Sequence, residues 1–208
     1  MGGDFYDFHP LPEGRLGLVL GDATGKGVPA VLVMSTTCGM LRLAAQALDS
    51  SSPGEVLEQV NEALLARIPS NMFVTCFYAI LDSKSGRLSY ANAGHDLPYV
   101  RRGGGDAEEL RARGMPLGLM PGMSYEEKEI ELDVGEGVFF YSDGLVEAHD
   151  PKGEMFGFPR LRALVADHRE EGSLGNFLLE ELYSFTREGW EQEDDITLVM
   201  LQRSAARS

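Results

Sequence analysis

Acidic residues stand beside predicted strand ends at several places in this chain, and carboxylates gathered in that way could hold metal cations. The positions that share this setting are Asp4, Asp22, Asp143 and the pair Asp194–Asp195. An Asp-Gly step after an apolar run, as at Asp143, is equally typical of an ordinary turn. A metal site therefore requires that the separate carboxylates converge.

The first two carboxylates are predicted to face each other across a β-hairpin. Residues 1–9 alternate as an extended strand, residues 10–14 supply a turn, and residues 15–21 form an apolar second strand. A hairpin centred near Glu13 places Asp4 directly opposite Asp22. Opposed like charges destabilise a sheet unless something offsets them, and a bound cation is the natural candidate.

The later carboxylates are predicted to lie at one sheet end. Asp143 follows an apolar strand that ends at Ser142, and Asp194 precedes the apolar segment 196–201. If these strands are antiparallel neighbours, both acidic positions fall at the same end. Oxygen ligands without His or Cys suit Mg²⁺ or Mn²⁺ better than zinc. Two such ions, roughly 3.5–4 Å apart, can activate water and clamp a phosphoryl group.

Hydrophobic periodicity predicts a single α+β domain over residues 1–203, with a frayed tail at 204–208. Ser52 to Glu55 is a capping box, and it predicts a helix that ends near Pro69. The other predicted helices are 28–48, 158–168 and 174–187. The further predicted strands are 72–82, 87–93, 97–102, 123–132, 137–142 and 196–201.

Composition argues against several classes of partner. The chain of 208 residues carries a net charge of −15, which disfavours docking onto nucleic acid or an anionic membrane. We expect no apolar run long enough to span a membrane and no signal peptide. Cys38 and Cys76 lack ligand or disulfide spacing and are expected to be reduced, which favours a cytoplasmic protein.

Five motifs in order resemble the SpoIIE/RsbU-type branch of the PP2C (PPM) phosphatases. Each is weakly specific alone, but together they span nearly the whole chain. They are the segments Gly2–Asp7, Gly21–Gly27, Ala91–His95, Ser142–Gly144 and Asp194–Thr197.

The resemblance implies an αββα sandwich of antiparallel sheets flanked by helices, and a centre of two Mn²⁺ or Mg²⁺ ions. It implies that bridging water hydrolyses phosphoserine or phosphothreonine without a phosphoenzyme. Matching positions make Asp4 the first-strand ligand, Asp22 the bridging ligand and Ala23 a carbonyl ligand. Asp143 and Asp194 match the later ligands, because the family's ligand is the first residue of its D-[DN]-x-T pattern.

The chain also departs from the wider family. Eukaryotic PP2C enzymes carry a histidine, the proposed general acid, where this chain has Thr24. His95 is a candidate substitute, although a structural role in ordering the Gly94–His95 turn is favoured. The upstream helix and first strand that often link the family to a sensory domain are missing from this sequence.

Several other features have simpler interpretations. Residues 21–27 fail as a phosphate-binding P-loop, because the spacing is one residue short and Gly27 replaces the Mg²⁺-binding hydroxyl. Asp7 could join the metal site or be a surface carboxylate. Residues 115–123 could be a partner-binding flap, although an ordinary loop over the core is favoured. Surface or loop positions are expected for His9, His149, His168, Asp106, Glu108 and Glu109.

The sequence thus predicts a metal-dependent protein serine/threonine phosphatase. The resemblance suggests a phosphorylated anti-sigma-factor antagonist, or a similar bacterial signalling protein of stress response or sporulation, as its substrate. Two alternatives stay open: a non-catalytic partner-binding module of the same fold, and a hydrolase of a small phosphate ester or nucleotide.

Overall fold

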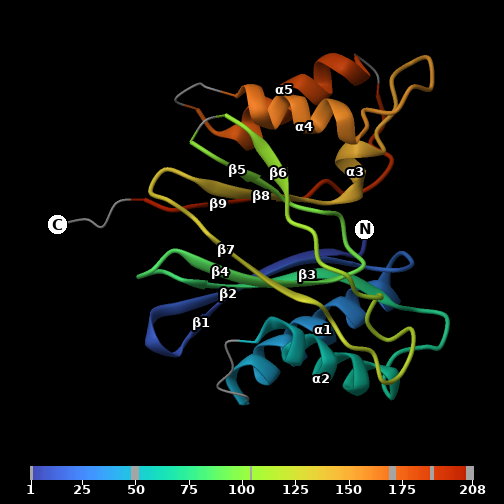
Figure 1. The fold of residues 1–208 in the computed structure, drawn as a ribbon. Helices are drawn as coiled ribbons and strands as arrows, with labels where there is room; N and C mark the ends of the chain where they lie inside the picture. The colour runs from blue at the N-terminus through green and yellow to red at the C-terminus, as the bar shows by residue number, and fades with distance from the viewer. Residues whose placement is uncertain (1, 48–51, 104, 169–171, 188–189, 205–208) are drawn as a thin grey trace. The chain divides into compact units, whose positions relative to one another are not determined.

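The computed structural model describes residues 2–47, 52–103, 105–168, 172–187 and 190–204. The chain divides into two compact units, and each is described by itself. The first unit comprises Met1–His95 and Arg111–Leu132, and the second comprises Asp96–Leu110 and Asp133–Ser208. Figure 1 follows the elements of both.

The first unit is built on a five-stranded antiparallel sheet in the order β1-β2-β3-β4-β7. A short 3-10 turn, Pro12–Gly14, joins its first two strands. The pairing sets Asp4 opposite Asp22, so the predicted hairpin register is confirmed. The strands are β1 (Asp4–Leu11), β2 (Arg15–Ala23), β3 (Val74–Asp82), β4 (Arg87–Ala93) and β7 (Glu127–Glu131).

Two helices cover one face of this sheet, α1 (Val28–Ala47) and α2 (Pro53–Leu65) (Figure 1). The capping prediction for α2 is confirmed, since the Glu55 N–H donates to the Ser52 side chain at 3.1 Å. The helix ends earlier than predicted. The backbone N–H groups of residues 67 and 68 both donate to the Leu64 carbonyl and close the last turn.

Helix α1 corrects one expectation. Its 20 residues are long and apolar enough to cross a membrane by length and composition, so the expectation that no run reaches that length was wrong. Length and composition alone do not make α1 a membrane span, because core helices of globular proteins meet the same criterion. Helix α1 indeed buries Val33, Leu41 and Ala45 in the core of the first unit, while Leu32 and Leu43 are exposed.

The second unit contains a four-stranded antiparallel sheet in the order β6-β5-β8-β9. Helices α4 and α5 pack over it (Figure 1), and stacked rings of Tyr99, Phe139 and Tyr141 fill its core. The elements are β5 (Tyr99–Arg101), β6 (Ala107–Glu109), β8 (Gly137–Tyr141), α3 (Asp143–Val146), α4 (Phe158–Asp167), α5 (Leu174–Thr186) and β9 (Leu198–Gln202).

The fold class is confirmed as α+β, with two elements that the sequence did not predict. Glu108 and Glu109 belong to strand β6, which pairs with β5, so the loop prediction for them was wrong; Asp106 does lie in the loop before it. Asp143 begins the one-turn helix α3. Three-residue strands and single helical turns are too short to show a hydrophobic period, which explains both omissions. Residues 205–208 of the predicted tail lie outside the described residues.

Candidate metal centre

The first acidic pair lies where strands β1 and β2 end, and the backbone around it is closely packed. The Ala23 N–H donates to the Gly3 carbonyl at 3.1 Å, which extends the pairing one step beyond Asp4 and Asp22. A Cβ on Gly3 would lie 2.0 Å from the Ala23 carbonyl oxygen and 2.4 Å from Asp22 Oδ1. A larger residue would therefore fill the space beside both oxygens, which belong to two of the predicted ligands.

Asp7 does not share the position of Asp4. Side chains alternate along a strand, so residues 4 and 7 point to opposite faces. Asp7 instead receives two hydrogen bonds from Arg42 of α1, both at 2.5 Å. This guanidinium lowers the pKa of Asp7 below its usual range, partly opposed by burial. The ion-paired interpretation of Asp7 is therefore favoured over metal ligation.

The second acidic pair lies at the end of β8 and the start of β9. These strands are antiparallel neighbours, as predicted, with Tyr141 opposite Leu198. Beyond the Tyr141–Leu198 pair, the buried Ser142 connects the two segments of the chain. Its hydroxyl donates to the Asp195 carbonyl at 3.3 Å and accepts from the Thr197 N–H at 2.9 Å. A Cβ on Gly144 would lie 2.1 Å from the Asp195 carbonyl oxygen.

Electrostatic interaction with Asp143 distinguishes Asp194 from its neighbour Asp195. Burial and then the Asp194 carboxylate raise the pKa of Asp143, and backbone hydrogen bonds partly oppose that shift. The backbone of Asp195 is held by Ser142, whereas Asp194 is exposed and accepts from the Asp195 N–H at 2.9 Å. The charge of Asp194 thus acts on Asp143, which favours the prediction that Asp194, and not Asp195, is the metal ligand.

Asp96 is an acidic residue near this pair that sequence reasoning missed. Burial, Asp143 and Glu147 together raise its pKa to about 6, in that order of importance. Its Oδ2 atom is buried without a hydrogen-bond partner. Its position directly after the Gly94–His95 motif was the available signal, but its proximity to Asp143 depends on the β5–β8 pairing.

Structural contacts hold both His95, the candidate general acid, and Thr24, which replaces the histidine of the wider family. The hydroxyl of Thr24 donates to the Phe73 carbonyl at 3.0 Å and accepts from the Phe73 N–H at 2.9 Å. His95 lies in a turn held by Asn92, which accepts from the His95 N–H at 2.8 Å and donates to its carbonyl at 2.9 Å. The ring Nδ1 of His95 lies 3.1 Å from Thr75 Oγ1. These contacts support the structural interpretation of His95.

The surface prediction for the remaining histidines was wrong for two of them. His9 is 1% exposed and its Nε2 lies 3.0 Å from the Tyr78 hydroxyl. Gly17, opposite it on β2, leaves the space that the ring fills. His168 is 4% exposed, whereas His149 is partly exposed and pairs with Glu193 at 3.0 Å. The two cysteines are free thiols, as expected.

Residues 115–123, the possible partner-binding flap, form an ordinary loop over the core. Leu117 is fully buried and exchanges backbone hydrogen bonds with Val74. The Asn61 side chain on α2 accepts from the Gly118 N–H and donates to the Met120 carbonyl. These contacts hold the loop against α2 and favour the interpretation as a covering loop over a partner-binding flap.

The donor set fits a hard cation in chemical type. Each acidic pair offers carboxylate oxygens, and Ala23 adds a carbonyl, which are the ligand types that Mg²⁺ and Mn²⁺ prefer. Asp4 and Asp22 belong to the first unit, and Asp143 and Asp194 to the second. Over the described ranges, no group of three or more His, Cys, Asp or Glu side chains is arranged to hold a metal ion. The ligand assignment thus stays a prediction.

Comparison with known proteins finds a matching family model and related sequences. The model of the family described as Stage II sporulation protein E (SpoIIE) matches residues 12–204. Phosphoserine phosphatase RsbU of Bacillus subtilis is 28% identical over 98% of this chain and 60% of that protein. The chain spans between 24% and 60% of the length of four curated relatives that it matches.

Solved structures agree with the sequence relationship. The RsbU and RsbW domains of Rv1364c from Mycobacterium tuberculosis match with a TM-score of 0.82 and 29% identity, over 100% of this chain and 58% of that chain. The SiaA-PP2C domain of Pseudomonas aeruginosa matches with a TM-score of 0.83 over 97% of this chain and 80% of that chain. Its identity is 23%, so this second match shows the fold alone.

Proposed function

Because the chain belongs to the SpoIIE family and has the fold of PP2C domains, we propose that it is a metal-dependent protein serine/threonine phosphatase. The observation that carries the proposal is the pairing of Asp4 with Asp22 beside Gly3, whose missing side chain leaves space next to Asp22 Oδ1 and the Ala23 carbonyl. A hairpin that opposes two carboxylates at its end costs stability unless a cation is bound there.

We assign Asp4, Asp22, Asp143, Asp194 and the Ala23 carbonyl as the groups that hold two Mn²⁺ or Mg²⁺ ions. When bound, such ions would activate water and neutralise charge on the phosphoryl oxygens. The residues of the chain fix the donors: the backbone bond from Ala23 to Gly3 orients one pair, and Ser142 orients the other. The raised pKa of Asp143 means that its carboxylate gains from a neighbouring positive charge.

This assignment names no residue as the general acid. The Thr24 hydroxyl both donates to and accepts from the Phe73 backbone, so it has no free proton for a leaving group. His95 is held by Asn92 and Thr75, and we assign it to the ordering of the Gly94–His95 turn. A leaving group protonated by solvent requires neither residue.

We further propose that the substrate is a phosphorylated bacterial signalling protein, such as an anti-sigma-factor antagonist, in the cytoplasm. The name of RsbU as a phosphoserine phosphatase supports the phosphoserine class. The family resemblance supports the choice of signalling protein. Reduced Cys38 and buried Cys76, whose thiol pKa burial raises, suit a reducing compartment.

The test is metal-dependent hydrolysis of p-nitrophenyl phosphate and of a phosphoserine protein. Mn²⁺ should support both reactions and EDTA should abolish them. Asp22→Ala should lower the rate at least a thousandfold, because it removes the proposed bridging ligand. Asp106→Asn, which removes the same charge from an exposed loop, should leave the rate within twofold.

Three outcomes would count against parts of the proposal. Equal activity in Asp22→Ala and the parent would overturn the metal mechanism. A parent that binds no Mn²⁺ in a calorimetric titration would favour the non-catalytic module. Nucleotides or sugar phosphates that turn over far faster than phosphoproteins would favour the small-ester hydrolase.

A further inference from the structure

Strand β1 carries a buried histidine, His9, that the proposed metal centre does not use. The side chain is 1% exposed, and its ring fills the space that Gly17 leaves on β2. Its Nε2 lies 3.0 Å from the Tyr78 hydroxyl, and the two rings stack with their centroids 5.8 Å apart. The other ring nitrogen, Nδ1, is buried without a hydrogen-bond partner. The ring is therefore held in place with one nitrogen paired and one nitrogen unpaired.

The carboxylate of Asp7, on the same face of β1, lies close to the unpaired nitrogen. Asp7 Oδ2 is 3.8 Å from His9 Nδ1, which is too far for a hydrogen bond. The same Oδ2 atom accepts from Arg42 Nε of α1 at 2.5 Å, and Oδ1 accepts from a second guanidinium nitrogen. One carboxylate thus lies between a group that is always charged, Arg42, and a group that is charged only when protonated, His9.

Burial decides the charge of His9 near neutral pH. Removal from water lowers the pKa of His9 below its ordinary value of 6.5. The Asp7 carboxylate partly opposes this shift, and the Arg42 charge adds to it. The histidine is therefore neutral at neutral pH and takes up a proton from solvent on acidification.

The titratable groups that adjoin this cluster from neighbouring elements keep one charge state over roughly pH 5 to 8. Burial raises the pKa of the Tyr78 hydroxyl and of the Cys76 thiol, both on β3. It also raises the pKa of Cys38 on α1 to about 11. Arg15 of β2, whose charge acts on Tyr78, stays protonated. His9 is thus the group of this cluster that changes charge on mild acidification.

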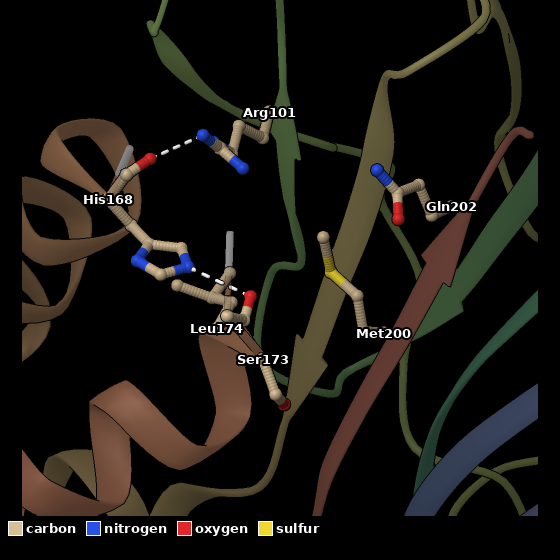
Figure 2. Close-up of a pocket in the computed structure, with 7 residues that line it drawn as sticks. Arg101, His168, Ser173, Leu174, Met200 and Gln202 are labelled. Atoms are coloured by element: carbon tan, nitrogen blue, oxygen red, sulfur yellow. Dashed lines mark hydrogen bonds between the residues drawn. The ribbon is translucent and has the colours of Figure 1, made fainter. Parts of the chain in front are cut away.

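His168, a buried histidine of the second unit, lacks this arrangement. Its Nε2 donates to the Gly172 carbonyl at 3.4 Å, and its own backbone carbonyl accepts from Arg101 (Figure 2). Within the described ranges, no carboxylate pairs with His168. An arginine beside a buried histidine therefore creates no competition by itself. The shared carboxylate is what distinguishes His9.

We propose that His9 is an acid-sensitive switch that, once protonated, competes with Arg42 of α1 for the Asp7 carboxylate. A protonated Nδ1 needs an acceptor, and Asp7 Oδ2 is the carboxylate oxygen beside it. A movement of about 1 Å brings that oxygen into hydrogen-bond range of Nδ1. The movement weakens the ion pair that joins β1 to α1. The switch does not depend on the proposed metal centre, although β1 also carries Asp4.

The sign of the effect on stability follows from the lowered pKa. Folded His9 binds a proton less readily than unfolded His9, whose pKa is the ordinary 6.5. Its contribution to stability is therefore fully present above pH 6.5 and is lost as the pH falls through the lower, folded pKa. In urea denaturation, His9→Gln should remove this part of the pH dependence.

The decisive experiment follows the whole chain by NMR from about pH 8 to about pH 5. The ring protons of His9 report its protonation, and the Arg42 Nε chemical shift reports the bond to Asp7. Both signals should change with one shared midpoint below pH 6.5. In His9→Gln, the Arg42 signal should stay constant over this range. His149→Gln removes a partly exposed histidine of the second unit and should leave the response as in the parent.

Asp7→Asn removes the shared carboxylate and decides the matter if His9→Gln does not fold. The midpoint of His9 should fall further in this variant, because Asp7 favours the protonated ring. The Arg42 signal should lose its response at the same time. The proposal is overturned if the His9 ring takes up no proton before the chain unfolds, or if Arg42 ignores that proton in the parent. An Arg42 response that persists in His9→Gln, or a midpoint that rises in Asp7→Asn, also overturns it.

Discussion

The two acidic pairs of this protein are positioned by different means. Asp4 and Asp22 are 18 positions apart and meet through the register of one hairpin. Asp143 and Asp194 are 51 positions apart and interact only after β8 pairs with β9. The first pair depends on local backbone geometry, whereas the second depends on long-range packing.

The contacts beside the two pairs also differ, because the backbone makes the first and a side chain makes the second. A backbone hydrogen bond from Ala23 to Gly3 extends the hairpin, and it involves no side-chain group. The second pair relies on the Ser142 hydroxyl, which holds the backbone of Asp195 and Thr197. The stability of the first end should therefore depend less on side-chain hydrogen bonds than the stability of the second. Substitutions at the adjoining residues test this difference.

The largest effect is expected for Gly144→Ala. The added Cβ would lie 2.1 Å from a backbone oxygen of Asp195, so the end of β8 or the start of β9 must shift. We expect a loss of about 3 kcal/mol in the free energy of unfolding, measured by urea denaturation. Gly39→Ala in α1 is the control, since its Cβ meets no atom within 4 Å. Equal stabilities of the two variants would contradict the proposed tight packing.

Ser142→Ala tests the hydroxyl contact directly. The Asp195 carbonyl and the Thr197 N–H each lose a hydrogen bond at a fully buried position. The expected destabilisation is about 2 kcal/mol by the same urea measurement. Ser89→Ala, which removes a weak contact of 3.4 Å to Glu129, should cost less than about 0.5 kcal/mol. Similar costs for both serines would show that the Ser142 contact does not stabilise the β8–β9 end.

The sequence predicted what depends on neighbours along the chain. The hairpin register and the Ser52 cap of α2 follow from turn and capping residues within a few positions. The sequence did not predict the features that depend on elements far apart in the chain. His9 is buried because Gly17 leaves space for its ring, and Asp96 lies near Asp143 because β5 pairs with β8. No local pattern carries that information.

Gly3→Ala tests whether the space beside the Ala23 carbonyl and Asp22 is used by a metal ion. Its Cβ would fill the space beside Ala23 O and Asp22 Oδ1, so Mn²⁺ affinity should fall about tenfold, or about 1.4 kcal/mol. Because the Cβ would also meet the Ala23 backbone oxygen, the free energy of unfolding should fall by about 2 kcal/mol, which leaves the protein folded during the titration. Calorimetric titration with Mn²⁺ measures the first quantity. An unchanged affinity would remove Gly3 and Ala23 from the proposed centre.

The smallest effect concerns the ion pair of Asp7 with Arg42, on the opposite face of β1 from Asp4. The guanidinium lowers the pKa of Asp7 in the folded chain below its value of 3.8 in the unfolded chain. The stabilisation is therefore fully present above pH 3.8 and is lost as the pH falls through the lower, folded pKa. Asp7→Asn should cost about 1 kcal/mol near neutral pH, a small value because Arg42 is half exposed and solvent screens the pair.

Urea denaturation of the parent and Asp7→Asn at several pH values measures this difference. It should shrink steadily as the solution is acidified below pH 3.8, the ordinary pKa of the carboxyl. Arg42→Gln should remove the same increment, and the double variant should lose little more than either single variant. Mn²⁺ affinity should be unchanged in Asp7→Asn, because strand alternation turns its side chain away from the first acidic pair. A loss of metal affinity in this variant would instead make Asp7 a ligand and Arg42 its competitor.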